Sequence, residues 1–282
     1  MKQILIISGK GGTGKTILTA SFAAISKNKV MVDCDVDAAD LHLILHPNIK
    51  ERYDFKSGKT AVVNPIFCNK CGKCQEVCRF DAISDAFLID SISCEGCGLC
   101  AQVCQSNAII MKENLSGEWY VSDTEYGPLV HAKLGIAEEN SGKLVAKVRQ
   151  VAKELAQKEN SDYVIIDGPP GIGCPVIASL SGIDMAVIIT EPTLSGLHDL
   201  KRAIEIALHF KILIGIVINK YDLNVDNTNK IEEFCKKTKI DIIGKIPFSK
   251  EVSKSIVNGI PAVLFCKNNI AENIRNIWEK IK

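Results

Sequence analysis

The chain has 282 residues, of which 46% are hydrophobic, and its formal net charge at pH 7 is +1. This length is enough for one large hydrophobic core and a small second domain. A charge so close to zero does not indicate a nucleic-acid-binding surface or a polybasic membrane patch, so we expect neither nucleic acid nor membrane as a partner.

The first residues do not have the pattern of an export signal. The apolar run at residues 4–7 is short and leads into Ser8 and a series of glycines, as a buried strand followed by a loop would. No apolar run is long enough to span a bilayer. These features predict a cytoplasmic protein. In a reducing cytoplasm, regularly spaced cysteines indicate metal ligands rather than disulfides.

A glycine-rich segment follows the first predicted strand and precedes a helix predicted over residues 16–27. It fits the pattern G-x-x-x-x-G-K-[ST], in which backbone N–H groups and a helix N-terminus converge on phosphate oxygens. Lys15 is expected to reach the β- and γ-phosphates, and Thr16 to ligate Mg²⁺. The residues expected to bind the nucleotide here are Gly9, Lys10, Gly11, Gly12, Thr13, Gly14, Lys15 and Thr16.

Four carboxylates follow the second predicted strand, residues 30–33; they are Asp33, Asp35, Asp37 and Asp40. Ligands bind beyond the carboxyl ends of parallel strands in open α/β sheets, so we expect a functional carboxylate here. Asp35 is predicted to orient a water or to hold the water shell of the metal. Asp37 and Asp40 are the candidates for a helix N-cap.

Residues 46–64 have the composition of a connector, with Pro47, Gly58 and Pro65 as breakers. A cysteine-rich region follows, from about residue 64 to 111. Two strands are predicted after it, at residues 118–122 and 129–134, and then a helix at 144–155 for which Ser141 is the candidate cap.

The cysteine-rich region contains two copies of C-x₂-C-x₂-C-x₃-C with a period of 26 residues. This is the bacterial ferredoxin spacing, in which the fourth cysteine of each run ligates the cluster of the other run. One 4Fe–4S cluster is therefore expected on Cys68, Cys71, Cys74 and Cys104. The second is expected on Cys94, Cys97, Cys100 and Cys78.

Structural zinc is the alternative for these cysteines, because it also uses C-x₂-C pairs. A tetrahedral zinc site does not need the third and fourth cysteine of each run, which favours iron–sulfur clusters. The sequence departs from the ferredoxin pattern at one point. The proline that usually follows the fourth cysteine is replaced by Arg79 in the first run and by Gln105 in the second.

A third buried strand is predicted at residues 163–167, and it ends at Asp167 before a glycine-containing loop. This is the Walker B arrangement, in which the carboxylate holds the Mg²⁺ shell. The remaining predicted elements alternate: strands at 185–190, 212–219 and 240–246, and helices at 195–209, 230–237, 250–258 and 270–281. In the last helix Ile270, Ile274, Ile277 and Ile281 lie on one face, and we expect that face to pack on the sheet.

This alternation predicts an α/β fold with a doubly wound, mostly parallel sheet. The P-loop ATPase domain is expected to comprise residues 1–60 and 113–282. A small α+β ferredoxin-like domain is expected to be inserted at residues 61–112.

Residues 10–16, with lysines at both Lys10 and Lys15, resemble the deviant Walker A motif of the MinD/ParA class of P-loop ATPases. The nitrogenase iron protein and the Mrp iron–sulfur carriers belong to the same class. With its cysteine insert, the chain resembles the branch of MinD-type ATPases that carries a two-cluster ferredoxin domain, and residues 191–200 are also typical of that branch.

The resemblance implies a homodimer that forms on ATP binding, with Lys10 reaching the nucleotide of the partner copy. It implies that Asp35 orients the attacking water and that Asp167 is the corresponding residue of the second switch. The expected catalytic residues are Lys10, Lys15, Asp35 and Asp167. The expected base-binding residues are Asn219, Pro247 and Phe248.

Two features leave alternatives open. Residues 219–222 also fit the guanine-reading pattern N-K-x-D, so GTP is the alternative to ATP. Cys174 lies seven positions after Asp167, as does a cluster-ligating cysteine in the nitrogenase iron protein. A buried small apolar residue is the other interpretation of Cys174.

Three functions are compatible with these features. The leading hypothesis is an ATPase that couples its nucleotide state to electron transfer through two clusters to an unidentified redox partner. The second is an ATP-dependent carrier or assembly protein that delivers clusters or metal to a client protein. The third is a positioning ATPase of the ParA kind with structural clusters.

Overall fold

A computed structural model of the chain describes residues 1–135, 141–267 and 269–282. The contacts divide the chain into two compact units. The first holds Met1–Tyr53, Trp119–Lys133 and Ser141–Lys282, and the second is formed mainly by Asp54–Glu118. The expected insert, residues 61–112, lies within the second unit.

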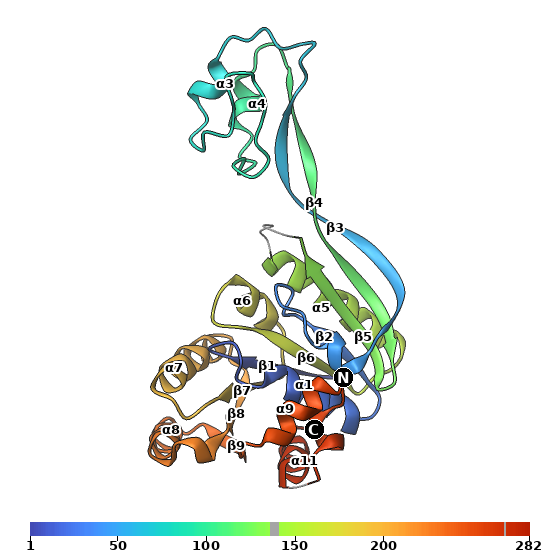
Figure 1. Cartoon of the computed structure of the whole chain (residues 1–282), viewed down its shortest axis with the longest axis vertical. Helices are drawn as coiled ribbons and strands as arrows, with labels where there is room; N and C mark the ends of the chain where they lie inside the picture. The colour runs from blue at the N-terminus through green and yellow to red at the C-terminus, as the bar shows by residue number, and fades with distance from the viewer. Residues whose placement is uncertain (136–140, 268) are drawn as a thin grey trace. The chain divides into compact units, whose positions relative to one another are not determined.

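The described residues form a nine-stranded sheet with the order β3-β4-β5-β2-β6-β1-β7-β8-β9 (Figure 1). The strands are β1 Lys2–Ser8, β2 Lys29–Asp33, β3 Asn48–Val63, β4 Ile109–Thr124, β5 Gly127–Leu134, β6 Tyr163–Pro170, β7 Met185–Thr190, β8 Leu213–Asn219 and β9 Asp241–Ile246. The neighbours from β5 to β9 in this order all pair in parallel. The predicted α/β fold with a mostly parallel sheet is confirmed.

Helices connect these strands. The longer ones are α1 Lys15–Ile25, α5 Ser141–Lys158, α6 Cys174–Leu180, α7 Leu194–His209, α8 Val225–Thr238, α9 Lys250–Val257 and α11 Asn269–Ile281. Short helices are α2 His42–Leu45, α3 Lys73–Glu76, α4 Leu99–Val103, α10 Ala262–Phe265 and the 3₁₀ turn η1 Tyr221–Leu223. Within the described part of the chain, no helix combines the length and the hydropathy that crossing a bilayer requires.

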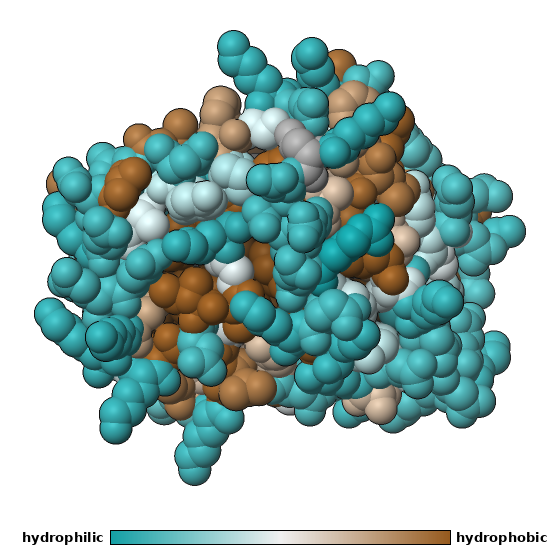
Figure 2. Space-filling view, turned by 90° about the horizontal axis from the view of Figure 1, so that it is seen from below, coloured by the Kyte–Doolittle hydropathy of each residue, from teal (hydrophilic) through white to brown (hydrophobic). Residues whose placement is uncertain are grey.

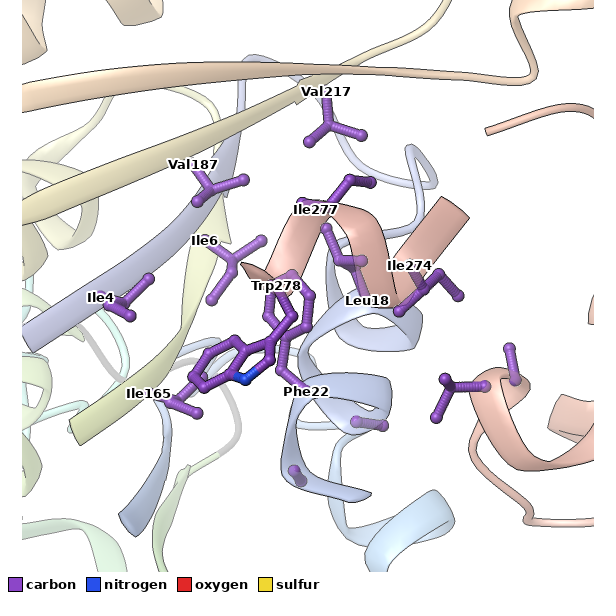
Figure 3. Packing of buried hydrophobic residues seen from close by; sticks show 14 of the residues in the cluster. Ile4, Ile6, Leu18, Phe22, Ile165, Val187, Val217, Ile274, Ile277 and Trp278 are labelled. Atoms are coloured by element: carbon purple, nitrogen blue, oxygen red, sulfur yellow. The ribbon is translucent and has the colours of Figure 1, made fainter. Parts of the chain in front are cut away.

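The central strands are buried on both faces, as their continuous apolar runs predict. Ile4 and Ile6 of β1 pack on one side with Phe22 of α1 and Trp278 of α11, whose ring centroids are 5.3 Å apart (Figure 3). The predicted apolar face of the last helix is confirmed, since Ile274, Ile277 and the other two isoleucines are at most 2% exposed. Elsewhere, apolar patches lie between hydrophilic side chains on the face shown in Figure 2, as on most protein surfaces.

The predicted connector at residues 46–64 is wrong, because β3 runs through Asn48–Val63. Most of this strand is exposed on both faces, so it lacks the alternation of apolar residues that identifies a half-buried strand. Its neighbour in the sheet is β4, which is likewise longer than the predicted strand at 118–122. Pairing between strands distant in sequence therefore stabilises β3, and a local pattern does not reveal such pairing.

Helix α8 begins at Val225, before the predicted start at residue 230. The side chain of Asn224 caps it by accepting a hydrogen bond from the Asn227 N–H at 2.9 Å. Thr193 caps α7 in the same way through the Gly196 N–H, at 2.9 Å. Asn and Thr are favoured N-caps, so these two starts were readable from the sequence.

Candidate nucleotide and cysteine sites

The loop between β1 and α1 lies at the carboxyl end of the sheet, where parallel strands bring several loops together. Gly12 and Gly14 have φ angles of 75° and 97°, a region that side chains with a Cβ rarely adopt. A Cβ on Gly14 would also lie 2.6 Å from Asn219 Nδ2. Lys15 follows as the first residue of α1 and is only 5% exposed. The loop thus has the backbone geometry that close approach to phosphate requires.

Asp167 lies in the buried part of β6, next to Asp33 of β2 in the sheet register. Its Oδ1 accepts a hydrogen bond from Thr19 Oγ1 at 3.0 Å. Its Oδ2 is buried and has no hydrogen-bond partner among the described residues, and the same holds for Thr13 Oγ1 in the glycine-rich loop. Buried polar atoms are rarely left unpaired without a functional reason. A free carboxylate oxygen beside Thr16 fits the oxygen ligands of Mg²⁺.

Burial raises the pKa of Asp167 from its ordinary value of 3.8 to about 6. Hydrogen bonds from Thr16 and Thr19 and the charge of Lys15 oppose this shift, while the charge of Asp35 adds to it. A cation bound at this carboxylate would favour its ionised form. The chain therefore holds at this position an acid that becomes a good metal ligand only when it loses a proton.

Replacing Asp167 by Asn should make the nucleotide-free protein less sensitive to pH between 3.8 and about 6. In this interval the unfolded carboxyl is ionised while the folded one keeps its proton, so stability falls as pH rises. The loss amounts to at most about 1.4 kcal/mol for each pH unit. Urea unfolding from pH 4 to pH 7 measures it, with the exposed Asp241→Asn as control. An identical pH profile for Asp167→Asn and the unmodified chain would contradict the shift.

Asp33 holds the loop that carries the predicted catalytic carboxylate Asp35. One oxygen of Asp33 accepts from the Asp35 N–H at 3.0 Å, and the other accepts from the Leu41 N–H at 3.2 Å. Burial raises the pKa of Asp35, whereas the charge of Lys15 lowers it. The sequence showed four carboxylates in this loop, but it did not show that Asp33 is buried and bonds both ends of it.

Lys10, expected to act on a second copy, has its partners within its own chain. Its Nζ lies 3.6 Å from Glu191 Oε2 and 3.4 Å from Thr193 Oγ1. Glu191 also pairs with Lys220 through its other oxygen. Sequence reasoning did not predict a role for Glu191, although it lies in the segment 191–200 that was considered typical of the family branch. In a single chain, Glu191 therefore pairs with two lysines beside the glycine-rich loop.

The residues expected to bind the nucleotide base take part in two separate hydrogen bonds. Asn219 Nδ2 donates to the Thr13 carbonyl at 2.8 Å, so this side chain lies against the glycine-rich loop. Asp222, the last residue of the N-K-x-D match, accepts from the Phe248 N–H at 2.7 Å. Phe248 itself is 44% exposed and follows Pro247. A backbone contact therefore already uses one oxygen of the carboxylate that would read guanine.

The eight cysteines of the repeat line two cavities in the second unit. The first cysteine cavity is lined by Cys68, Cys71, Cys74 and Cys104. The second cysteine cavity is lined by Cys78, Cys94, Cys97 and Cys100. Each cavity thus has three cysteines from one run and the fourth from the other run, the grouping that the spacing predicts.

The two cavities are equivalent beyond their cysteines. Val63 and Ser106 line the first cavity, and the residues 26 positions away, Ile89 and Phe80, line the second. The backbone repeats as well, since Gly72 and Gly98 have φ angles of 83° and 76°. The sequence repeat is therefore also a structural repeat, with one cavity for each copy.

Among the described residues, no group of three or more His, Cys, Asp or Glu side chains is arranged to hold a single metal ion. The other cysteines lie in the first unit. Cys34, Cys235 and Cys266 are buried, whereas Cys174 at the start of α6 is exposed. The interpretation of Cys174 as a buried apolar residue is therefore wrong.

Comparisons with known proteins find several that are similar in sequence to this chain. An uncharacterised protein of Methanocaldococcus jannaschii is 38% identical over 285 residues, covering 99% of this chain and 96% of that protein. An iron-sulfur cluster carrier protein of the same organism is 29% identical over 156 residues, covering 50% of this chain and 53% of that protein.

A similar solved structure is the septum site-determining protein MinD of Pyrococcus horikoshii complexed with Mg-ADP. It has a TM-score of 0.62 at 18% identity and covers 100% of this chain and 96% of that one. The CobQ/CobB/MinD/ParA nucleotide-binding domain matches residues 4–262. With a P-loop, a buried Asp167 and a family match over most of its length, the chain belongs to the CobQ/CobB/MinD/ParA family of nucleotide-binding proteins.

Proposed function

We propose that the protein hydrolyses ATP and couples its nucleotide state to electron transfer through two 4Fe–4S clusters to a partner protein. The observation that carries this proposal is the pair of equivalent cavities, each lined by four cysteines, in a chain that also has a complete P-loop. Such clusters supply one-electron chemistry when bound to four thiolates.

In the nucleotide site, the proposed roles are those that the P-loop motif and the family resemblance imply, and the contacts of these residues are consistent with them. The backbone N–H groups of residues 9–14 and the side chain of Lys15 bind the phosphates. Thr16 and the unpaired oxygen of Asp167 hold Mg²⁺. Asp35, positioned by Asp33, orients the attacking water. Lys10 leaves Glu191 and reaches the nucleotide of a second copy in an ATP-bound homodimer.

In the cysteine region, the residues fit clusters better than single zinc ions. Zinc needs four ligands from two C-x₂-C pairs and not the third and fourth cysteine of each run, whereas all four cysteines of each set line one cavity here. Backbone groups also face the sulfurs, since the Ala108 N–H donates to Cys104 Sγ at 3.3 Å. Hydrogen bonds to cluster sulfurs are among the features that tune such sites.

ATP is proposed over GTP because residues 10–16 resemble the deviant Walker A motif of the MinD/ParA ATPases. Asp222, the residue that would read guanine, uses one of its two carboxylate oxygens for the Phe248 N–H. The residues proposed to contact the adenine are Asn219, Pro247 and Phe248.

Electron paramagnetic resonance of the dithionite-reduced protein, with and without nucleotide, tests the coupling. We expect signals of reduced 4Fe–4S clusters that change on addition of MgATP and not of MgGTP, because the γ-phosphate contacts bias the loops that precede the cysteine region in sequence. Lys15→Ala, which removes the phosphate contact, is expected to abolish the change and to retain the signals. Identical spectra with and without MgATP would reject the coupling.

The second candidate is a cluster carrier, and the similarity to an iron-sulfur cluster carrier protein favours it. Cys71 and Cys97 are exposed, so each cavity has one cysteine accessible to a client protein. Incubation with an apoferredoxin separates the two functions. Iron that moves to the acceptor on ATP addition supports the carrier, whereas iron that stays while the clusters are reversibly reduced supports electron transfer.

A further inference from the structure

The two cysteine cavities match in shape but differ in charge. Lys73 lines the first cysteine cavity, and its counterpart 26 positions later, Leu99, lines the second. Asn69 lines the first cavity, and its counterpart Glu95 lines the second. The lining of the first cavity therefore includes a cation and no anion, whereas the lining of the second includes an anion and no cation.

Lys70 adds a second cation beside the first cavity, between two of its cysteines. Its φ angle is 55°, close to the 65° of its counterpart Gly96. Glycine takes this conformation freely, whereas a residue with a Cβ adopts it at a cost in conformational free energy. At Gly96 no residue with a Cβ fits, because that Cβ would lie 2.1 Å from the Lys59 carbonyl oxygen. The first copy thus has space for a side chain at this position and carries an exposed lysine despite the backbone cost.

The apolar surface near the two cavities does not differ in the same way. Ile66 and Ile92 each precede the first cysteine of a run by two positions and are 84% and 86% exposed. In both copies the isoleucine N–H donates to an aspartate or asparagine side chain two residues earlier, at 3.0 Å. Each cavity therefore has the same exposed isoleucine beside it, and charge is what distinguishes the two surfaces.

We propose that the surface formed by Ile66, Lys70 and Lys73 is the docking site for a redox protein with an acidic surface. This inference rests on the proposed function, because it assigns the first cysteine cavity as the one that exchanges electrons with that partner. Complementary charge around an apolar contact steers and orients a transient partner. The corresponding surface around Ile92 instead has Asp90 and Glu95, which oppose an acidic partner, and a single opposing charge on Arg79 next to Cys78 of the second cavity.

The experiment uses the intact cluster-loaded chain and an acidic flavodoxin as the probe, with binding measured by calorimetry at low ionic strength. The test variant combines Lys70→Gly with Lys73→Leu, which gives the first copy the residues of the second. We expect its affinity to fall roughly tenfold, which corresponds to about 1.4 kcal/mol. Because the Debye length falls to about 3 Å at 1 M salt, the difference should disappear there. Glu95→Ala is the matched control on the second copy and should bind within about twofold of the unmodified chain.

Three outcomes would overturn the docking site: no binding of the unmodified chain, equal affinity for the Lys70/Lys73 double variant, or an equal loss for Glu95→Ala. Single-stranded DNA that binds as tightly as flavodoxin and loses affinity in the same variant would replace a protein partner with a nucleic acid. Iron content is measured for every variant first. A chain without clusters that still binds flavodoxin through the two lysines would contradict the proposed electron transfer but leave the docking site intact.

Discussion

Replacing Lys10 by Ala is expected to lower the rate of ATP hydrolysis roughly 10²–10³-fold while the affinity for ATP changes little. This magnitude is typical for loss of one group that stabilises charge developing on a transition state. In a single chain Lys10 lies against Glu191 and Thr193, and the proposal assigns it to the nucleotide of the partner copy, so we expect little change in the affinity of its own copy. Steady-state phosphate release and equilibrium binding of a fluorescent ATP analogue measure the two quantities.

Lys153→Ala serves as a control, because this lysine is exposed on α5. Analytical ultracentrifugation with MgATP adds a second readout, in which the unmodified chain should dimerise and the Lys10→Ala variant should not. Full hydrolysis and dimerisation by the Lys10→Ala variant would contradict the role of Lys10 in a two-copy nucleotide site. Hydrolysis that is lost with dimerisation retained would assign Lys10 to chemistry within an assembled dimer.

Replacing Cys104 by Ala is expected to remove one cluster, and replacing Cys78 by Ala the other. Each change should lower the iron content from roughly eight to roughly four atoms per chain. The cluster lost with Cys104 should be the one held by the first cysteine run, because Cys104 lines the cavity of Cys68, Cys71 and Cys74. Iron analysis and electron paramagnetic resonance on each variant measure the loss.

The buried Cys235→Ala is the matched control and should leave the iron content unchanged. Loss of the same spectral signal from Cys104→Ala and Cys97→Ala would contradict the exchange of the fourth ligand between the runs, because these two cysteines belong to the same run. Zinc without iron in the anaerobically purified protein would reject the clusters altogether. The fourth cysteine is the position that tests the exchange of ligands. The first three cysteines of a run bind the same cluster whether or not the fourth is exchanged.

The elements closest to prediction were the strands of the central sheet. The predicted strand at 185–190 coincides with β7, and the predicted strands at 163–167 and 30–33 lie within β6 and β2. These strands are covered on both faces, so their apolar runs leave a local signal. The connector over 46–64 failed for the opposite reason, because β3 is exposed and depends on β4 for its pairing.

In the nucleotide site, too, features with a local sequence signal were predicted and contacts between distant residues were not. The glycine-rich loop was readable because phosphate binding requires glycines and a lysine at fixed spacing. The contacts of Glu191 with Lys10 and Lys220 were not readable, since the three residues come from loops that follow different strands. Cys174 is exposed, whereas the other cysteines outside the two runs are buried. The residues next to Cys174 in the sequence did not predict this exposure.

The sequence by itself determined the P-loop, the two cysteine runs and the alternating strands and helices, because each depends on residues close together in the chain. Only the tertiary structure decided that Asp33 positions the loop of Asp35, that a lysine pair meets one glutamate, and that two equivalent cavities differ in charge. These properties depend on burial and on distances between distant residues. The chain acquires them only when parallel strands and the repeated cysteine copies come together in space.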